Sequence, residues 1–494
     1  MEKLLEFVSQ HMSDDTTRLI LDKGKWPDID METAVNCIES RRKLKGKVQA
    51  WHDNPGLIFP LKLSAEQCSS SATGEYKAKL AERIAAKSSW RIADLTGGLG
   101  VDSWFFSQKA EKVLYNEMQT ALCDAARHNF KSLGAGNIHI SNAKAESGAI
   151  GNILSGFCPD IIYMDPARRG EGGKKVFLIE ECTPDVLTLK EEIFSICRHI
   201  LIKLSPMADI SMVCDRLGET CREVHVVTSE GECKELLIWM DKEWKDGYSI
   251  MAAELPHGYP AKEAAAITFT PEDERTAHAD IAVEIKGFLF EPGKSLTKAG
   301  AFNATSVHFQ IPKLGKSTHY YIVTDEGKAE ELKKYGKVLA VVAFCMPFVY
   351  ALLDAFGTFL DDAFFLVEDI ASTPLVDVTE ETIEAVANTS YELTFALFAL
   401  GLFIFMKAKK VKFGPVPQHK DKILAAVFET AGQFTYVYAL GEQDAIAAPI
   451  LSSVCIVSLL LSRIFLKEKL SWKTYVFIAV VIVGILLLAV AEEL

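Results

Sequence analysis

Three glycines within four residues, directly after a short apolar run, constrain this chain more than any other feature. The stretch Arg91–Asp102 reads Arg-Ile-Ala-Asp-Leu-Thr-Gly-Gly-Leu-Gly-Val-Asp. Its first five residues predict a strand, and Val101–Gln108 predicts a helix, so the glycines form the turn between them. Glycine lets a backbone turn sharply and approach a ligand closely. The stretch therefore predicts a ligand site at the end of a strand, without saying which ligand.

The residues around this loop alternate between strand and helix patterns. Strands are predicted at Arg91–Leu95, Lys112–Tyr115, Ile138–Ser141, Ile161–Met164 and Ile200–Leu204. Such alternation predicts a Rossmann-like α/β domain, in which helices cover a mostly parallel sheet. A Ser-Glu-Gly-Glu turn then joins Glu223–Thr228 to Cys233–Met240, which predicts an antiparallel hairpin at the end of the domain. This ending favours the layout of class I methyltransferases over that of NAD dehydrogenases.

Three carboxylates lie at predicted strand ends, where α/β sheets bind their ligands. Asp94 directly precedes the glycines, and Glu117 follows the second strand, where a carboxylate can accept hydrogen bonds from both hydroxyls of a ribose. The alternative for Glu117 is a solvated charge. Asp165-Pro166 ends the fourth strand. Its alternative is a capping aspartate in a loop that proline terminates.

A carboxylate at the position of Asp165 suits a specific chemistry. An exocyclic amine of a nucleic-acid base is a poor nucleophile, because its lone pair is delocalised into the ring. A carboxylate and a backbone carbonyl that accept its two protons would orient the lone pair toward a sulfonium methyl group. Positioning and electrostatics then supply most of the acceleration, and no metal is needed.

Taken together, these motifs resemble bacterial class I S-adenosylmethionine-dependent methyltransferases that carry a C-terminal THUMP-like module and are similar to rRNA guanine-N2 methyltransferases. The resemblance covers about residues 1–337. It implies that S-adenosylmethionine is the cofactor, that RNA is the partner, and that Asp165 and Pro166 are catalytic. The implied cofactor-binding residues are Asp94, Thr96, Gly97, Gly98, Gly100, Asp102, Glu117 and Asn142.

The chain departs from this family pattern at two places. Amine methyltransferases usually follow the acid with two prolines and an aromatic residue, whereas Ala167 and Arg168 stand here. Arg168 or Arg169 would then bind the substrate, by stacking on a base or by a bidentate contact with phosphate. The second departure is Asn142, which replaces an acid near the adenine and can still form a hydrogen bond with the ring.

The sequence divides into four predicted parts: a helical domain at residues 1–88, the methyltransferase domain at 89–248, a small α+β module at 249–337, and a membrane domain at 338–494. The module, THUMP-like or ferredoxin-like and shortened at its end, contains Gly287-Phe-Leu-Phe-Glu-Pro-Gly and Ser317-Thr-His-Tyr-Tyr. Helices are predicted in the first part at Glu2–Met12, Thr33–Leu44 and Tyr76–Ala86, with a loop at Gln67–Gly74. Strands are predicted in the module at Ala266–Phe269, Ile281–Ile285, Val307–Gln310 and Tyr320–Val323.

Five apolar stretches follow the module and predict about five membrane-spanning helices. They are Val338–Leu360, Glu392–Met406, Ile423–Leu440, Ala445–Leu466 and Tyr475–Ala491. Lysine and arginine gather in the loops around 407–422 and 463–473, which the positive-inside rule places in the cytoplasm. The predicted location is therefore the inner membrane, with residues 1–337 also in the cytoplasm.

The membrane part resembles one five-helix half of an EamA-type drug/metabolite transporter. The resemblance rests on the number of spans, on Ala448-Pro449 and on Phe465-Leu-Lys-Glu-Lys-Leu-Ser-Trp. A single half would need a second copy or another protein to enclose a path. Asp354 and Glu429 fall inside predicted spans, and ionisable residues there are candidate pathway residues. Their alternatives are an interfacial position for Asp354 and a helix–helix contact for Glu429.

Bulk composition excludes one class of binding and leaves three readings of the whole chain. The 494 residues carry a formal net charge of −13, which excludes bulk positive charge as the means of binding nucleic acid. The 11 cysteines show no Cys-x-x-Cys pair and predict reduced thiols. The favoured reading is a membrane-anchored methyltransferase acting on RNA. The others are a transporter-class protein with a vestigial methyltransferase part, and a fused open reading frame.

Overall fold

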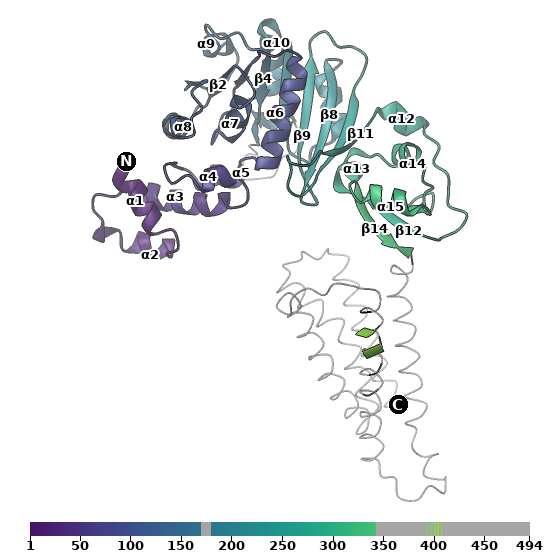
Figure 1. The fold of residues 1–494 in the computed structure, drawn as a ribbon. Helices are drawn as coiled ribbons and strands as arrows, with labels where there is room; N and C mark the ends of the chain where they lie inside the picture. The colour runs from purple at the N-terminus through teal and green to yellow at the C-terminus, as the bar shows by residue number, and fades with distance from the viewer. Residues whose placement is uncertain are drawn as a thin grey trace, which may run out of the picture. The chain divides into compact units, whose positions relative to one another are not determined.

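The computed structural model describes residues 1–168, 179–341 and the separate positions 393, 397, 400, 401, 403, 404 and 407. The chain divides into two compact units, Met1–Asp354 and Ala355–Leu494. Nearly all described residues belong to the first unit (Figure 1). The predicted membrane spans lie almost entirely outside the described residues, as do Arg169, Asp354 and Glu429. Within the described part, no helix is long and apolar enough to cross a bilayer.

The first part of the chain is helical, as predicted. Its elements are α1 (Glu2–Gln10), α2 (Thr16–Leu21), the short 3₁₀ helix η1 (Lys23–Lys25), α3 (Met31–Leu44), α4 (Gln49–His52), α5 (Lys62–Gln67) and α6 (Ser71–Ala85). Polar caps set where these helices begin, because a side-chain oxygen accepts a backbone N–H that has no partner within the helix. Asp15 caps α2 and Asp30 caps α3 in this way.

Helix α6 begins earlier than the sequence suggested. The small polar residues of Gln67–Gly74 predict a loop, but Ser71–Gly74 are the first turn of α6. Ser70 accepts a hydrogen bond from the backbone N–H of Thr73, and Thr73 accepts one from the backbone N–H of Ser70. This reciprocal capping box makes the same small polar residues start a helix.

A nine-stranded mixed sheet forms the centre of the unit, and its strand order is β11-β10-β8-β9-β7-β4-β1-β2-β3. The strands are β1 (Arg91–Asp94), β2 (Lys112–Asn116), β3 (Ile138–Ser141), β4 (Ile161–Met164), β7 (His199–Leu204), β8 (Cys221–Ser229), β9 (Glu232–Asp241), β10 (Ser249–Leu255) and β11 (Ala265–Phe269). The five strands from β3 to β7 in this order are parallel. Strand β9 inserts between β7 and β8 and runs antiparallel to both, so the predicted hairpin is confirmed. This is the Rossmann-like mixed sheet of methyltransferases.

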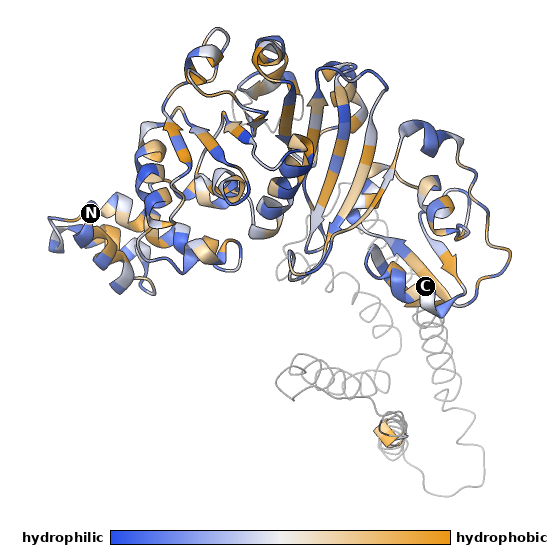
Figure 2. Ribbon diagram, turned by 45° about the horizontal axis from the view of Figure 1, so that its top comes forward, coloured by the Kyte–Doolittle hydropathy of each residue, from blue (hydrophilic) through white to orange (hydrophobic). Residues whose placement is uncertain are grey.

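Helices cover both faces of the sheet, and Figure 1 shows α6 along one of them. They are α7 (Val101–Ser107), α8 (Thr120–Ser132), α9 (Ile150–Ile153), α10 (Val186–Ile196) and α11 (Ile210–Leu217). Successive residues of a strand point to opposite faces. Ile92 of β1 accordingly packs with α6, α7 and the N-terminal helices, whereas Ala93 packs with α10 and α11. Figure 2 shows apolar residues along the strands between these layers.

The strands β10 and β11 extend the sheet beyond residue 248. Strand β10 pairs in parallel with β8, and β11 pairs antiparallel with β10. The strand predicted at Ala266–Phe269 therefore exists, but it belongs to the large sheet. A separate two-stranded sheet, β5 (Ala167–Arg168) with β6 (Cys182–Thr183), lies next to the candidate site, and a 3₁₀ helix, η3 (Ile179–Glu181), precedes β6.

The small module contains a three-stranded antiparallel sheet with the order β13-β12-β14. Its elements are β12 (Phe288–Pro292), β13 (Tyr321–Val323) and β14 (Gly336–Ala340), with α13 (Lys294–Ala299), α14 (Asn303–Phe309) and α15 (Glu326–Leu332), and α12 (Pro271–Thr276) precedes it. Strand β14 runs to Ala340, which pairs with Phe288, so the first three residues of the predicted first span belong to this sheet.

Two strand predictions in the module are wrong. Val307–Phe309 end helix α14, whose buried Thr305 and Phe309 are four residues apart, as on one face of a helix. Gln310 then adopts a left-handed conformation with φ 52°, which stops the helix. Ile281–Ile285 forms no strand, and only Ile281 makes an isolated bridge, with Lys313. Its alternating apolar residues look like a half-buried strand, but Val283 is almost fully exposed.

Candidate active site

The glycine loop lies between β1 and α7 and fits closely against β2 and α8. A Cβ atom at Gly97 would lie 2.2 Å from the ring of Tyr115, and one at Gly100 would lie 2.7 Å from the ring of Phe130. Gly98 and Gly100 have φ angles of +53° and +92°, which side chains rarely adopt. The loop is therefore held at a position that only glycine permits.

Asp94 ends β1 beneath this loop and is almost completely buried. Its carboxylate accepts hydrogen bonds from Ser103 Oγ at 2.6 Å and from the backbone N–H of Thr96 at 3.0 Å. Burial raises the pKa of Asp94 to about 7, and the nearby carboxylates of Asp102 and Asp165 add to the rise. Asp94 therefore changes its charge near neutral pH.

Glu117 follows β2 and faces the same loop. One of its carboxylate oxygens accepts the backbone N–H of Gly98 at 3.0 Å, and the other accepts that of Gln119 at 2.8 Å. Asn142, after β3, donates its side-chain amide to the backbone oxygens of Glu117 and Met118 at 2.7 and 3.2 Å. Glu117 lines the candidate cavity, whereas Asn142 is exposed, does not line the cavity and holds the backbone of the Glu117 turn.

A cavity of about 990 Å³ opens at the carboxyl edge of the parallel strands. It is lined by the whole stretch Asp94–Asp102 and by the ends of β2, β4 and β7, including Glu117, Asp165, Pro166 and Lys203. Residues 64 and 67–69, from α5 and the turn before α6, form another part of the wall. The first predicted domain therefore contributes to the cavity directly.

Asp165 stands at the end of β4, and two contacts fix it. Its backbone N–H donates to Thr96 Oγ1 at 2.6 Å, which ties it to the glycine loop. Its carboxylate oxygen Oδ2 forms an ion pair with Lys203 Nζ at 2.5 Å. Pro166 also lines the cavity, and the backbone of Arg168 pairs with Cys182 in the small β5–β6 sheet.

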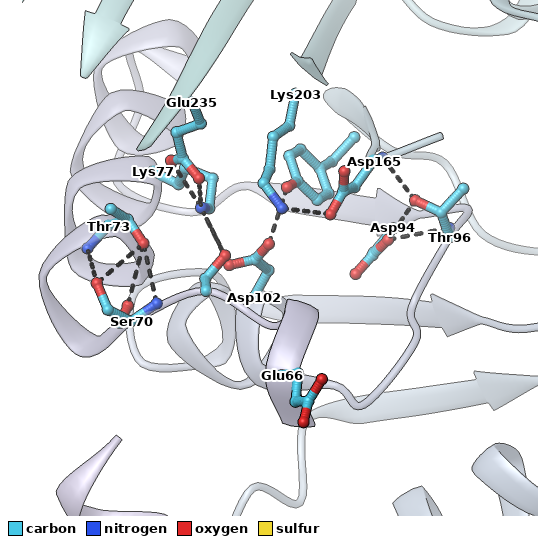
Figure 3. Close-up of polar contacts among 12 residues, drawn as sticks. Glu66, Ser70, Thr73, Lys77, Asp94, Thr96, Asp102, Asp165, Lys203 and Glu235 are labelled. Atoms are coloured by element: carbon cyan, nitrogen blue, oxygen red, sulfur yellow. Dashed lines mark hydrogen bonds and ion pairs between the residues drawn. The ribbon is translucent and has the colours of Figure 1, made fainter. Parts of the chain in front are cut away.

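A buried group of charges adjoins Asp165, as Figure 3 shows. Lys77 of α6 is fully buried and contacts both carboxylate oxygens of Glu235 at 2.8 and 2.9 Å, Ser69 Oγ at 2.8 Å and Asp102 Oδ1 at 3.3 Å. Asp102 also accepts a hydrogen bond from Tyr163 OH at 2.8 Å. We call Lys77, Asp102, Lys203, Glu235 and Asp165 the buried charge cluster.

Electrostatics within the buried charge cluster keep Asp102 ionised. Burial alone would raise its pKa, but the ammonium groups of Lys77 and Lys203 outweigh burial and lower it below the ordinary value. For Glu235 burial prevails and raises the pKa despite the same two lysines. Each buried charge therefore has an opposite charge beside it, as a low-dielectric interior requires.

Sequence reasoning missed Lys77, Lys203 and Glu235. Lys77 and Glu235 are 158 residues apart in the chain, and no local pattern joins them. Two of these residues could have been found from the sequence. Lys203 and Glu235 are charged residues within otherwise apolar strands, and such a residue indicates a buried charge that needs a partner. Among the described residues, no group of three or more His, Cys, Asp or Glu side chains is arranged to hold a metal ion.

Comparison with known proteins separates the chain into parts. The model of the EamA-like transporter family matches residues 371–490, nearly all of them outside the described residues. A ferredoxin-like domain model matches residues 288–327, within the small module. No curated protein matches the chain.

Solved structures resemble part of this chain. One from Porphyromonas gingivalis W83, provisionally assigned as a methyltransferase, is 29% identical over 65% of this chain and 78% of that chain, with a TM-score of 0.57. Two others are TrmK of M. capricolum with bound S-adenosyl-homocysteine (12% identity, 34% and 69% of the chains, TM-score 0.26) and an rRNA methylase from Streptococcus thermophilus (14%, 33% and 94%, 0.25). The likeness to the P. gingivalis structure supports a methyltransferase fold for this chain.

Proposed function

We propose that the first unit is an S-adenosylmethionine-dependent methyltransferase that acts on a base amine of RNA. The observation that carries the proposal is that the glycine loop, Asp94, Glu117 and Asp165 all line the same cavity. The likeness to the P. gingivalis structure supports the transferase class. The THUMP-like and rRNA resemblances of the sequence support RNA as the acceptor.

The residues at this edge fit the cofactor. Gly97, Gly98 and Gly100 leave the loop backbone open to close approach, and Glu117 offers a carboxylate for two vicinal hydroxyls. Asp94 offers a second carboxylate, at the position suited to the cationic amino group of the methionine moiety. The cavity volume of about 990 Å³ lies at the upper end of the range for small-molecule sites, so an acceptor base fits beside the cofactor.

The chemistry then depends on Asp165. When bound, S-adenosylmethionine supplies an electrophilic methyl group on a positively charged sulfur. Asp165 accepts an N–H of the acceptor amine and so turns the nitrogen lone pair toward that methyl group. In that reaction the methyl group would pass from sulfur to nitrogen, with S-adenosylhomocysteine as the leaving group, and the Asp165 carboxylate would pass the surplus proton of the amine to solvent. Arg168 and Arg169 would bind RNA phosphate or stack on the base.

Two measurements test this proposal. Calorimetry of the purified protein with S-adenosylmethionine should show binding, and no binding at high micromolar cofactor would refute the enzyme function. Tritiated methyl groups should pass from labelled cofactor into RNA, with protein and small molecules as parallel acceptors. Label appearing only in another acceptor would refute RNA as the substrate. Asp165→Ala should abolish transfer while it spares cofactor binding.

The EamA match favours a second function for the last third of the chain. Residues 338–494 would anchor the methyltransferase in the inner membrane, with residues 1–337 in the cytoplasm, or would form half of a transporter together with a second copy or another protein. Asp354 and Glu429 are the candidate pathway residues. Membrane fractionation of the full chain tests the anchor, because soluble, protease-intact protein would contradict it.

A further inference from the structure

Lys203 lies beside Asp165 because of the register between two parallel strands. Met164 of β4 pairs with Ile202 of β7, so the next residue of each strand reaches the carboxyl edge together. The Lys203 ammonium and Asp165 Oδ2 are 2.5 Å apart, and both residues line the cavity. The Lys203 side chain is only 13% exposed, whereas that of Asp165 is 37% exposed. The lysine therefore reaches the acid from the protein interior and leaves its outer side to the cavity.

Buried acids hold the lysine in this place. Burial would lower the pKa of Lys203, but the carboxylates of Asp165, Asp102 and Glu235 raise it well above the ordinary value. Lys203 is therefore an ammonium ion at every working pH. The charges of Asp102 and Glu235 stabilise this ammonium ion in addition to its ion pair with Asp165.

The Asp165 carboxylate has one oxygen occupied and one available. Oδ2 pairs with Lys203, and the backbone N–H of Asp165 is held by Thr96 Oγ1. Within residues 1–168 and 179–341, no group donates a hydrogen bond to Oδ1. An acceptor amine that enters the cavity thus meets one carboxylate oxygen whose direction is fixed at two points.

We propose that Lys203 is a positioning residue for methyl transfer, which fixes the Asp165 carboxylate by its ion pair so that Oδ1 alone faces the acceptor amine. The inference rests on the proposed function of this cavity. Lys203 acts through Asp165 and not on the acceptor itself. Its role is distinct from neutralising buried charge, which Lys77 also performs in the same cluster without touching Asp165.

The test compares Lys203→Met with Lys77→Met in the full-length protein in detergent. Methyl transfer uses labelled S-adenosylmethionine and ribosomal RNA transcribed in vitro, which carries no modified bases. Lys203→Met should lower kcat about 10- to 100-fold, with the RNA KM and the Kd for S-adenosylhomocysteine within about threefold of wild type. Lys203→Arg should restore part of kcat. Lys77→Met should lose folded protein, and its remaining folded fraction should keep a kcat nearer to wild type.

Two further results decide whether the effect runs through Asp165. Asp165→Asn combined with Lys203→Met should be no slower than Asp165→Asn alone, because the second change acts on a carboxylate that is already absent. If the double variant is instead slower than Asp165→Asn by the full factor that Lys203→Met costs alone, the inference is overturned. A Lys203→Met protein with wild-type kcat would overturn it as well.

A cofactor measurement separates this inference from the proposed function. The sulfonium of S-adenosylmethionine is positively charged and the sulfur of S-adenosylhomocysteine is neutral. The affinity for S-adenosylmethionine divided by the affinity for S-adenosylhomocysteine therefore reports the charge near Asp165. Removing the ammonium should raise this ratio about threefold or more at pH 8. An unchanged ratio would refute the ion pair even if RNA is not the acceptor. Wild-type protein that binds neither compound would instead refute the proposed function.

Discussion

The pKa of Asp94 makes the stability of the fold depend on pH. In the unfolded chain its carboxyl group ionises near 3.8, and in the folded protein only near 7. The folded state therefore binds one more proton than the unfolded state between these values, so stability falls as the pH rises through this window. Below 3.8 the contribution is fully present, and above about 7 it is lost.

The size of this effect follows from the two pKa values. The interval from 3.8 to about 7 corresponds to about 4 kcal/mol for a single buried group. Between pH 5 and pH 8 the expected loss in the free energy of unfolding is about 3 kcal/mol. Asparagine has no proton to lose and still offers an oxygen to Ser103. Asp94→Asn should therefore gain about 3 kcal/mol relative to wild type between pH 5 and pH 8.

The assay is chemical unfolding followed by tryptophan fluorescence at several pH values. Trp90 is buried directly before β1 and reports on the strand that carries Asp94. Ser103→Ala is the matched control, because the Ser103 hydrogen bond lowers the pKa of Asp94 and its loss should move the transition to higher pH. A stability difference between Asp94→Asn and wild type that stays constant from pH 5 to pH 8 would refute the reasoning.

Three other variants test the site. Gly97→Ala should lower stability by about 1–3 kcal/mol in thermal unfolding, because the added methyl meets the Tyr115 ring; Gly151→Ala, with open space around it, should not. Glu117→Gln should weaken cofactor binding about 10- to 100-fold in calorimetry. Glutamine has only one acceptor oxygen, so either the backbone N–H of Gly98 or that of Gln119 loses its partner. An unchanged affinity would show that Glu117 does not belong to the cofactor site. Glu235→Gln should destabilise the fold by about 3 kcal/mol in chemical unfolding because Lys77 loses its main partner, and a neutral result would contradict the pairing.

The parallel sheet and its loop were predictable because both have local signals. The strands predicted at Ile138–Ser141 and Ile161–Met164 match β3 and β4 residue for residue. Parallel strands then bring their carboxyl ends to one edge, so Glu117 and Asp165 meet there although 48 positions separate them. Spacing along the chain and sheet geometry were sufficient for these residues.

Other features depend on contacts between distant residues, which the spacing of residues along the sequence does not indicate. The role of Asn142 as an adenine contact stays a prediction, and the hydrogen bonds that its amide donates to the backbone of Glu117 and Met118 have no signal in the sequence. Val307–Gln310 alternates like a strand, yet the tertiary packing of Phe309 makes its first three residues helical. Local pattern sets which structures are possible, and packing against distant residues selects among them.

The buried charge cluster shows why the N-terminal helices and the candidate active site form one structure. Lys77 comes from α6, Asp102 from α7, Glu235 from β9, Lys203 from β7 and Asp165 from the end of β4. Removing one charge from such a group leaves its partner buried and unpaired, which costs about 3–5 kcal/mol. A displacement of α6 would thus leave Glu235 and Asp102 without the ammonium group that contacts them both, and the fold would lose stability. The stability of the fold around the candidate active site therefore depends on a helix that contributes no residue to the chemistry.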